Sequence, residues 1–328
     1  EYGMEERILL SAIRYDRGTV TIDGKEYPMR DMNFPTVDPA DPLRLTDEEE
    51  ELLHTLELSF RHNARLHEHV RFLYSNGSMY KCCNSNLLYH GCIPMTENRE
   101  FDGLMVGGKM YRGKELMDFI DTQVKNAYFL PEDAPEKEAR RDFMWYLWNG
   151  AKSPVFGKDK NRSFEHYFIE DPEVMRETMN PYYQLSEEEE TCDMILKEFG
   201  LPTKGSHIIN GHVPVKTIQG EQPMKANGKL FVIDGGFSKA YQPETGIAGY
   251  TLVYHSHGMQ LVQHEPFQSR QKAIEEGLDI KSTNFVLEFN SQRMMVKDTD
   301  KGKELVTQIQ DLKKLLVAYR TGLIKEKV

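Results

Sequence analysis

The sequence predicts a layered domain of the α/β or α+β class, in which helices and strands are mixed along the chain. Two observations support this class. Short β-branched runs bounded by glycine recur, as at Ile208-Ile209 and Phe231-Val232-Ile233, and such runs are typical of buried strands. Longer segments place apolar residues three or four positions apart, as from Leu52 to Leu73, and this spacing predicts amphipathic helices.

Length and composition limit the class of protein. The 328 residues suggest one large or two ordinary domains. A net charge of -11 argues against nucleic acid or an anionic membrane as the main partner. No apolar run approaches the roughly 20 residues of a membrane span. The four cysteines show no C-x-x-C spacing, so we expect reduced thiols in a cytoplasmic protein.

The first residues bear on processing and on local structure. Glu1 is not an initiator methionine and no signal peptide follows it, so we expect the chain to begin inside a longer one or after cleavage. Residues 1–13 have the pattern of the end of a helix, with Ile8, Leu9 and Ile13 on one side. Asp23-Gly24 between two short runs is a type I′ turn signal and predicts a hairpin.

The rest of segment 1–95 is expected to hold a long helix and a strand that ends at His90. Thr46 and Glu49 form a capping box at the start of the longest predicted helix. Its apolar stripe consists of Leu52, Leu53, Leu56, Phe60, Leu66, Val70 and Leu73. Two strands are predicted from Met79 to His90, on either side of Asn84-Ser85-Asn86.

Segment 96–205 is expected to be mainly helical. Amphipathic helices are predicted over Tyr111 to Phe129 and over Pro135 to Trp148. A third helix is expected after a capping box at Ser186 and Glu189, and Gly200 should end it. The apolar stripe of this third helix consists of Cys192, Ile195, Leu196 and Phe199.

Segment 206–290 is expected to be mainly β, and 291–328 to be a C-terminal helix. Strands over Tyr250 to His255 and Met259 to His264 should pair around a short turn, and Asn284 to Phe289 is a last strand. The final helix is predicted over Gly302 to Tyr319. Its inward residues are expected to be Leu305, Leu312, Leu316 and Tyr319.

The stretch from His207 to Ser238 holds the clearest candidate for chemistry. One strand stops at Asn210-Gly211-His212 and the next stops at Asp234-Gly235-Gly236. Strand ends in α/β proteins are where polar groups converge on a ligand, and histidine is the commonest metal-binding side chain. A glycine turn followed by an incidental histidine is the alternative interpretation.

The order of these elements resembles the second half of the calcineurin-like metallophosphoesterases, and within them the class III fructose-1,6-bisphosphatases of bacteria. Matching words follow in order: Leu88 to Pro94 (LYHGCIP), Trp148 to Pro154 (WNGAKSP), Phe164 to Glu170 (FEHYFIE) and Gly246 to Tyr254 (GIAGYTLVY). The resemblance implies that residues 1–328 are the C-terminal portion of a metallophosphoesterase catalytic domain. The implied fold is the C-terminal half of a layered β-sandwich flanked by helices.

The resemblance also implies a binuclear site for Mn²⁺ or Mg²⁺. Two ions about 4 Å apart would share a hydroxide placed in line with the phosphorus. By motif, two metal-ligand positions fall on His90 and His212. The D-x-H, G-D-x-x-D-R-G and G-N-H-[DE] motifs of the family's first half are absent, so catalytic residues and the other ligands are expected outside this chain. Asp16-Arg17-Gly18 matches only the tail of the second motif, and we interpret it as turn chemistry.

Seven further histidines are assigned to structure. His207 begins a strand, and His255 and His257 are expected to be exposed at a turn. Four more lie on or near the long helix: His54, His62, His67 and His69. His62 and His69 would share a helix face, but no carboxylate is arranged to complete a metal site, so a solvated face is expected.

A cationic run in this acidic chain provides candidates for substrate binding. It consists of Lys152, Lys158, Lys160 and Arg162. Lysine and arginine match the charge and geometry of phosphate. The alternative is a solvated lysine-rich loop. Lys239, directly after the Asp234-Gly235-Gly236 turn, is a less favoured candidate.

Two functional hypotheses follow. The resemblance implies a phosphoric monoester hydrolase that converts fructose 1,6-bisphosphate to fructose 6-phosphate and phosphate in gluconeogenesis. No residue identifies fructose, so a phosphoprotein or dinucleotide phosphatase of the same superfamily stays open. The second hypothesis is a non-catalytic binding or assembly module on a degenerate phosphatase fold, which the missing motifs support.

A geometric expectation accompanies the metal site. The strands around Leu88, Ile208, Val232 and Leu252 should lie in one sheet or in two packed sheets. His90 and His212 should then come to one edge, because ligands of neighbouring metal ions must be close together. The chain should also expose an apolar edge or pair with a second copy of itself in a homo-oligomer.

Overall fold

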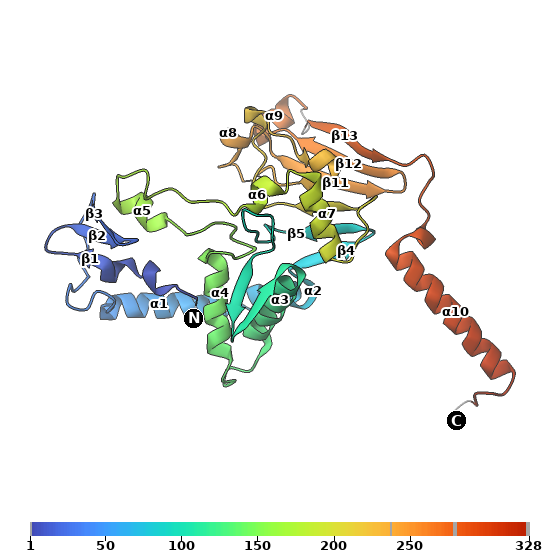
Figure 1. Cartoon of the computed structure of the whole chain (residues 1–328), viewed down its shortest axis with the longest axis horizontal. Coiled ribbons are helices and arrows are strands. Elements are labelled where there is room, and N and C mark those ends of the chain that lie inside the picture. Colours follow the sequence, from blue (N-terminus) through green and yellow to red (C-terminus); the bar gives the residue numbers. More distant parts are fainter. Residues whose placement is uncertain (1, 237, 278–280, 326–328) are drawn as a thin grey trace. The chain divides into compact units, whose positions relative to one another are not determined.

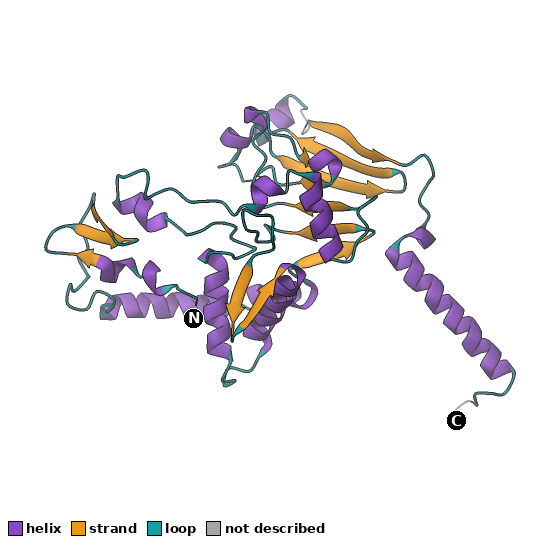
Figure 2. Ribbon diagram, in the orientation of Figure 1, coloured by secondary structure: helices purple, strands orange, loops and turns teal. Residues whose placement is uncertain are grey.

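The computed structural model describes residues 2–236, 238–277 and 281–325 and contains both helices and strands (Figures 1 and 2). The chain divides into two compact units. The first comprises Glu1–Tyr80 and His90–Leu185, and the second comprises Lys81–Tyr89 and Ser186–Val328. No helix within the described part of the chain is both long enough and apolar enough to cross a membrane. The mixed α and β content confirms the predicted class.

The first unit begins with a small antiparallel sheet in the order β1-β2-β3. Its strands are β1 (Ile13–Arg14), β2 (Thr19–Ile22) and β3 (Lys25–Pro28). Asp23 and Gly24 have φ values of 51° and 78°, which confirms the predicted type I′ turn. Asp16-Arg17-Gly18 forms the turn between β1 and β2, in agreement with its interpretation as turn chemistry.

The predicted helix end at residues 1–13 is wrong. Two short 3₁₀ helices, η1 (Glu5–Arg7) and η2 (Leu9–Ala12), occupy this segment, and Ile8 between them has non-helical dihedral angles. Leu9 and Ile13 pack into a core with Val20 of β2, whereas Ile8 is 43% exposed. The apolar residues of this segment therefore pack a short, bent stretch of chain against β2 and do not form one face of a helix.

The predicted long helix is two helices, α1 (Asp47–Arg61) and α2 (Ala64–Asn76). The capping box of Thr46 and Glu49 is confirmed. Asn63 leaves the helical region, and its side chain accepts a hydrogen bond from the Leu66 amide at 3.0 Å, which caps a new helix. No residue of α1 or α2 is buried. The predicted apolar stripe is therefore uncovered in this chain.

The central part of the first unit is built on two packed helices, α3 (Gly113–Phe129) and α4 (Lys137–Asn149) (Figure 1). Both helices were predicted. Leu116 and Ile120 of α3 meet Phe143 and Leu147 of α4 in one core cluster. A hairpin of β6 (Gly103–Val106) and β7 (Lys109–Arg112), which the sequence did not predict, precedes α3; α5 (Ser163–Phe168) and α6 (Tyr182–Leu185) follow α4.

The second unit contains a five-stranded sheet in the order β4-β5-β8-β10-β9. The strands are β4 (Tyr80–Cys83), β5 (Asn86–Tyr89), β8 (His207–Asn210), β9 (Met224–Lys225) and β10 (Leu230–Val232). Neighbours β5, β8 and β10 are parallel. The short helical segments η3 (Thr217–Gln219) and η4 (Ala226–Gly228) connect β8 to β9 and β9 to β10, and α8 (Gln242–Thr245) lies between β10 and the next sheet.

Helix α7 (Glu189–Glu198) belongs to the same unit. Its predicted apolar stripe is confirmed, because Cys192, Ile195 and Leu196 are fully buried. The predicted capping box at Ser186 is wrong: the helix is capped at Glu188 without a side-chain bond. Ser186 is instead buried, and its carbonyl accepts a hydrogen bond from the Cys192 thiol at 3.2 Å.

A second antiparallel sheet has the order β11-β12-β13. Its strands are β11 (Gly249–His255), β12 (Gly258–His264) and β13 (Ser282–Phe289), and α9 (Arg270–Glu275) precedes β13. Met259 of β12 shares a buried cluster with Ile209 of β8 and Phe231 of β10. The two sheets therefore pack face to face, which confirms the expectation for these strands. β13 forms an edge with Val286 and Phe289 exposed, as predicted for an apolar edge.

The C-terminal helix α10 (Asp300–Arg320) follows η5 (Val296–Asp298) and is present as predicted. The expectation that its apolar residues face inward is wrong. Leu305, Leu312, Leu316 and Tyr319 are 41%, 64%, 49% and 45% exposed. Only Gly302 of the helix is buried. Nothing in the described chain covers the stripe, because the helix is attached mainly through its first turn, where Asn84 and Asp300 exchange hydrogen bonds.

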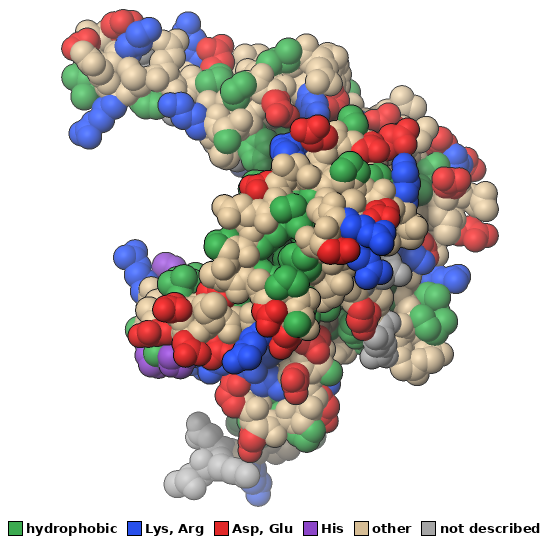
Figure 3. Space-filling model, turned by 90° about the vertical axis from the view of Figure 1, so that its left-hand side faces the viewer, with side chains coloured by type: hydrophobic (Ala, Val, Ile, Leu, Met, Phe, Trp, Pro, Cys, Tyr) green, Lys and Arg blue, Asp and Glu red, His purple; other side chains and the backbone are tan. Residues whose placement is uncertain are grey.

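Charge is distributed widely on the surface. Acidic and basic side chains are interspersed over the face drawn in Figure 3, with apolar side chains between them. Several ion pairs are exposed, as at Lys114–Asp118 and Lys301–Glu304, and such pairs stabilise a fold little. The buried ion pairs are consequently the ones that position segments of the chain.

Candidate functional site

The candidate site begins with the ends of three parallel strands. Leu88 of β5 lies opposite Ile209 of β8, and Asn210 of β8 lies opposite Val232 of β10. His90 directly follows β5, His212 follows β8 after one glycine, and Asp234 follows β10 after Ile233. The carboxyl ends of neighbouring parallel strands meet at one edge of a sheet, where α/β proteins bind ligands. The fold thus brings the strands that precede both predicted histidines into adjacent positions.

His212 has an unusual backbone conformation. Its φ is 68°, in the left-handed region that favours glycine, and the Val213 amide donates to the Gly211 carbonyl at 2.8 Å across it. Hydrogen bonds on both sides hold this turn: the Ile233 amide donates to the Asn210 carbonyl at 2.9 Å, and the Val215 amide donates to the Asp234 carbonyl at 2.8 Å. A strained residue that its surroundings enforce is a feature of functional sites.

The segment after His90 lies against the segment around Pro154. The Cys92 amide donates to the Pro154 carbonyl at 2.9 Å. Gly91 is required there, because a Cβ at this position would lie 2.3 Å from the same carbonyl oxygen. His90 itself is exposed, whereas the five residues after it are buried. Two of the matching sequence words, 88–94 and 148–154, are therefore in contact.

Buried polar groups support this region from below. The Asn180 side chain accepts hydrogen bonds from the amides of Met95 at 3.1 Å and Tyr182 at 3.0 Å. Cys92 is buried beside the Tyr183 hydroxyl, and burial raises the pKa of its thiol to about 12. A thiol that stays protonated at neutral pH is a poor nucleophile, so Cys92 has a structural role. All four cysteines are free thiols, as expected.

Lys152 is the most available of the predicted substrate-binding residues. Its side chain is 46% exposed and forms one ion pair, with Asp102 at 3.0 Å. Its φ of 64° is, like that of His212, in the left-handed region. The sequence word that contains Lys152 is thus bent at this residue. Lys239, the less favoured candidate, is exposed.

The other three predicted cations are engaged by carboxylates. Lys158 pairs with Glu177 at 2.5 Å, and Lys160 pairs with Asp23 in the turn between β2 and β3. Arg162 is buried and pairs with Asp23 at 3.2 Å and with Glu165 at 3.1 Å. These contacts connect the α5 segment to the N-terminal sheet. Substrate binding by the three residues stays a prediction, and their observed partners provide a structural role.

The pKa values of these carboxylates reflect the pairing. The hydrogen bond from Lys160 is the main cause that lowers the pKa of Asp23. Burial alone would raise the pKa of Glu165, but hydrogen bonds from Arg7 and Arg162 outweigh it and lower the pKa. The same balance between burial and the hydrogen bond from Lys158 lowers the pKa of Glu177. All three side chains therefore remain ionised and paired at neutral pH.

The remaining histidines have the structural positions expected of them, with one difference. The Nδ1 of His207 is 2.8 Å from the Gly228 carbonyl oxygen, at the start of β8. His255 and His257 lie at the β11–β12 turn but are half-buried rather than exposed, and His257 stacks on Phe289. The four helix histidines, His54, His62, His67 and His69, are exposed. The break at Asn63 puts His62 and His69 on different helices.

The described residues hold no group of three or more histidine, cysteine, aspartate or glutamate side chains arranged for a metal ion. From the sequence, Asp234 was predicted only as a strand end, and Asn210 only as part of a turn. In the sheet, Asn210 ends β8, which lies between β5 and β10, and Asp234 follows β10. Asn210 is 4% exposed. The sequence shows a polar residue at the end of each apolar run, which is a signal for such site residues. It does not show that the strands are parallel neighbours in one sheet.

Comparison with known proteins identifies the family. A family model described as Firmicute fructose-1,6-bisphosphatase matches residues 1–321, and the chain belongs to this family. Proteins named class 3 fructose-1,6-bisphosphatase are similar over the whole chain: 66% identical in Bacteroides thetaiotaomicron, 64% in Bacteroides fragilis and 52% in Clostridium tetani. The chain spans 49% of the first two relatives and 50% of the third. No solved structure matches.

Proposed function

We propose that this chain is the C-terminal part of a fructose-1,6-bisphosphatase of the metallophosphoesterase superfamily. The reaction would release phosphate from fructose 1,6-bisphosphate and leave fructose 6-phosphate, as a step of gluconeogenesis in the bacterial cytoplasm. The observation that carries the proposal is the position of His90 and His212 after neighbouring parallel strands of one sheet. The match to the family model over residues 1–321 supports the choice of fructose 1,6-bisphosphate as the substrate.

The residues present fit part of a binuclear Mn²⁺ or Mg²⁺ site. Imidazole nitrogens are suitable ligands, and the enforced turn at His212 would present its ring in a defined direction. His90 and His212 would each hold one position of the site, and residues outside this chain would complete it. Two divalent ions bound there would lower the pKa of a water molecule and neutralise charge on the phosphoryl group. Lys152, half-exposed beside Asp102, would bind phosphoryl oxygens.

The layering of the fold supports the same superfamily. Two sheets pack through Ile209, Phe231 and Met259, and α7 buries its apolar stripe within the same unit. A sandwich flanked by helices is the arrangement that the resemblance implies. A homo-oligomer is a further part of the proposal, because exposed apolar side chains of β13 and α10 offer contact surfaces.

Two lengths of protein test the proposal. Both the 328-residue chain and a protein of the relatives' length that contains it are assayed for phosphate release from fructose 1,6-bisphosphate with Mn²⁺. We expect turnover from the longer protein and little or none from the chain alone, because two histidines do not hold two ions. Substantial metal-dependent turnover by the 328-residue chain would contradict the proposal that residues outside this chain complete the metal site.

Single substitutions in the longer protein test the ligands. His90→Ala and His212→Ala should each remove nearly all turnover and lower bound Mn²⁺ from about two ions per chain to about one. His69→Ala, an exposed histidine of α2, is the matched control and should change neither quantity. Retention of both ions by a His90 or His212 variant with a native circular dichroism spectrum would remove that residue from the site.

A further inference from the structure

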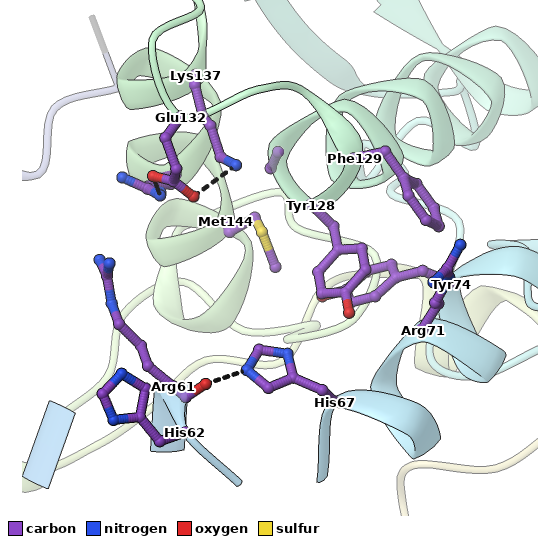
Figure 4. A pocket seen from close by; sticks show the side chains of 12 residues that line it. Arg61, His62, His67, Arg71, Tyr74, Tyr128, Phe129, Glu132, Lys137 and Met144 are labelled. Atoms are coloured by element: carbon purple, nitrogen blue, oxygen red, sulfur yellow. Dashed lines mark hydrogen bonds and ion pairs between the residues drawn. The ribbon is translucent and has the colours of Figure 1, made fainter. Parts of the chain in front are cut away.

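The first unit contains an open cavity of about 860 Å³ that the proposed reaction does not use. It lies where the α1–α2 junction meets the end of α3 and the start of α4 (Figure 4). Its volume is within the range of about 300–1,000 Å³ that small-molecule sites occupy. None of its lining residues is among the predicted metal ligands or the predicted phosphate-binding cations.

The charge of the lining is opposite to the charge of the protein. Four cationic side chains line the cavity, and Glu132 is the one carboxylate among the lining residues that the structure describes. The cations are Arg61, Arg71, Lys137 and Arg141. The whole chain carries a net charge of -11. A concave, locally positive surface on an acidic protein attracts anions selectively to one place.

The existing ion pairs leave part of this positive charge unmatched. Lys137, whose side chain is 7% exposed, donates to Glu132 at 2.8 Å, and Arg141 donates to the other oxygen of the same carboxylate. One carboxylate therefore serves two cations. Hydrogen bonds from Lys137 and Arg141 lower the pKa of Glu132 to about 2, so it stays ionised. Arg61 pairs with Glu57 at 2.8 Å.

Arg71 differs from the other three cations. It forms no hydrogen bond or ion pair with any residue in the part of the chain that the structure describes. Beside it, the rings of Tyr74 and Tyr128 stack with centroids 4.7 Å apart and form one wall (Figure 4). A planar guanidinium with free donors beside an ordered aromatic wall can bind two oxygens of one oxyanion.

We propose that this cavity binds a small phosphorylated anion, with Arg71 as its main contact and Arg61, Lys137 and Arg141 as supporting charges. The phosphate group can come from free phosphate, from fructose 6-phosphate or from fructose 1,6-bisphosphate, and the experiment separates these sources. The site would allow a product or a substrate of phosphate-ester hydrolysis to bind the chain independently of metal.

The test measures binding of each of the three compounds to the 328-residue chain by calorimetry, at low ionic strength and without divalent metal. We expect saturable binding of one or more of them, and Arg71→Gln should weaken it by at least about tenfold, as removal of a charge-assisted contact does. Arg65→Gln is the matched control: it removes an exposed arginine of the same helix that does not line the cavity.

Several outcomes would overturn the proposal. These are no saturable binding of any of the three compounds, equal weakening by Arg65→Gln and Arg71→Gln, or unchanged binding by Arg71→Gln. Circular dichroism checks that each variant is folded, and Arg61→Gln replaces Arg71→Gln if the latter unfolds. Because the assay contains no metal and measures no turnover, its result does not depend on whether the chain is part of a fructose-1,6-bisphosphatase.

Discussion

At the scale of single residues, two candidate site residues share an uncommon backbone conformation. His212 and Lys152 both occupy the left-handed region, and both lie in sequence words that resemble one family. The spacing of residues predicted a histidine after a strand. It did not predict that this histidine would be held in a conformation that favours glycine, because hydrogen bonds from distant strands impose it.

This strain can be measured. His212→Gly and His212→Ala both remove the imidazole and its contacts, so their difference reports on the backbone. We expect the glycine variant to be more stable than the alanine variant by about 1 kcal/mol, because alanine pays for the left-handed conformation and glycine does not. Urea unfolding of the 328-residue chain gives both free energies of unfolding. Equal stabilities would show that residue 212 leaves the left-handed region in solution.

At the scale of elements, the apolar periodicity of a helix predicted its existence but not its partner. α7 and α10 both have apolar stripes, yet Leu196 of α7 is fully buried and Leu312 of α10 is 64% exposed. α1 and α2 were predicted as one helix, because the spacing of apolar residues continues across Asn63. The polar cap that Asn63 provides to Leu66 makes the break.

The two helices should respond differently to the same substitution. Leu196→Ala should lower the free energy of unfolding by about 2–5 kcal/mol, because it opens a cavity in a packed core. Leu312→Ala should change it by no more than about 0.5 kcal/mol, as is usual for an exposed position. Chemical denaturation of the two variants makes the comparison. A large loss from Leu312→Ala would mean that α10 is packed in solution, for example against a second copy.

At the scale of the whole molecule, ionised carboxylates hold segments together in both units. Glu165, fully buried between Arg7 and Arg162, connects residues more than 150 positions apart in the first unit. Glu221 accepts hydrogen bonds from the Lys216 amide and from Lys225 in the second unit, and its pKa is lowered because these bonds outweigh its burial. The folded protein therefore holds these groups ionised more firmly than the unfolded chain does.

This arrangement determines how stability depends on pH. For a carboxylate whose pKa is lower in the folded state, the stabilisation is complete above the unfolded value of about 4 and is lost as the pH falls through the folded value. We expect the free energy of unfolding to fall on acidification below about pH 4.5. Glu165→Gln should cost about 3 kcal/mol at pH 7 and should flatten the acid side of the curve. An unchanged acid profile in this variant would contradict the role of Glu165.

The sequence by itself determined the features that depend on neighbouring residues. These include the turn at Asp23-Gly24, the strands on either side of Asn84-Ser85, the helices α3, α4 and α7, and the position of each histidine relative to its own strand. Turn geometry and apolar spacing are local properties, so one stretch of chain specifies them. The family resemblance added the expected activity and the expectation that this chain supplies only part of the metal site.

Only the tertiary structure decided which local elements become neighbours. It placed β5 beside β8, paired Lys160 with Asp23, left α10 uncovered and gathered four cations from three helices around one cavity. These outcomes depend on contacts between residues that are tens to hundreds of positions apart. The free energy of such contacts is shared between two distant segments, and neither segment's own pattern specifies its partner.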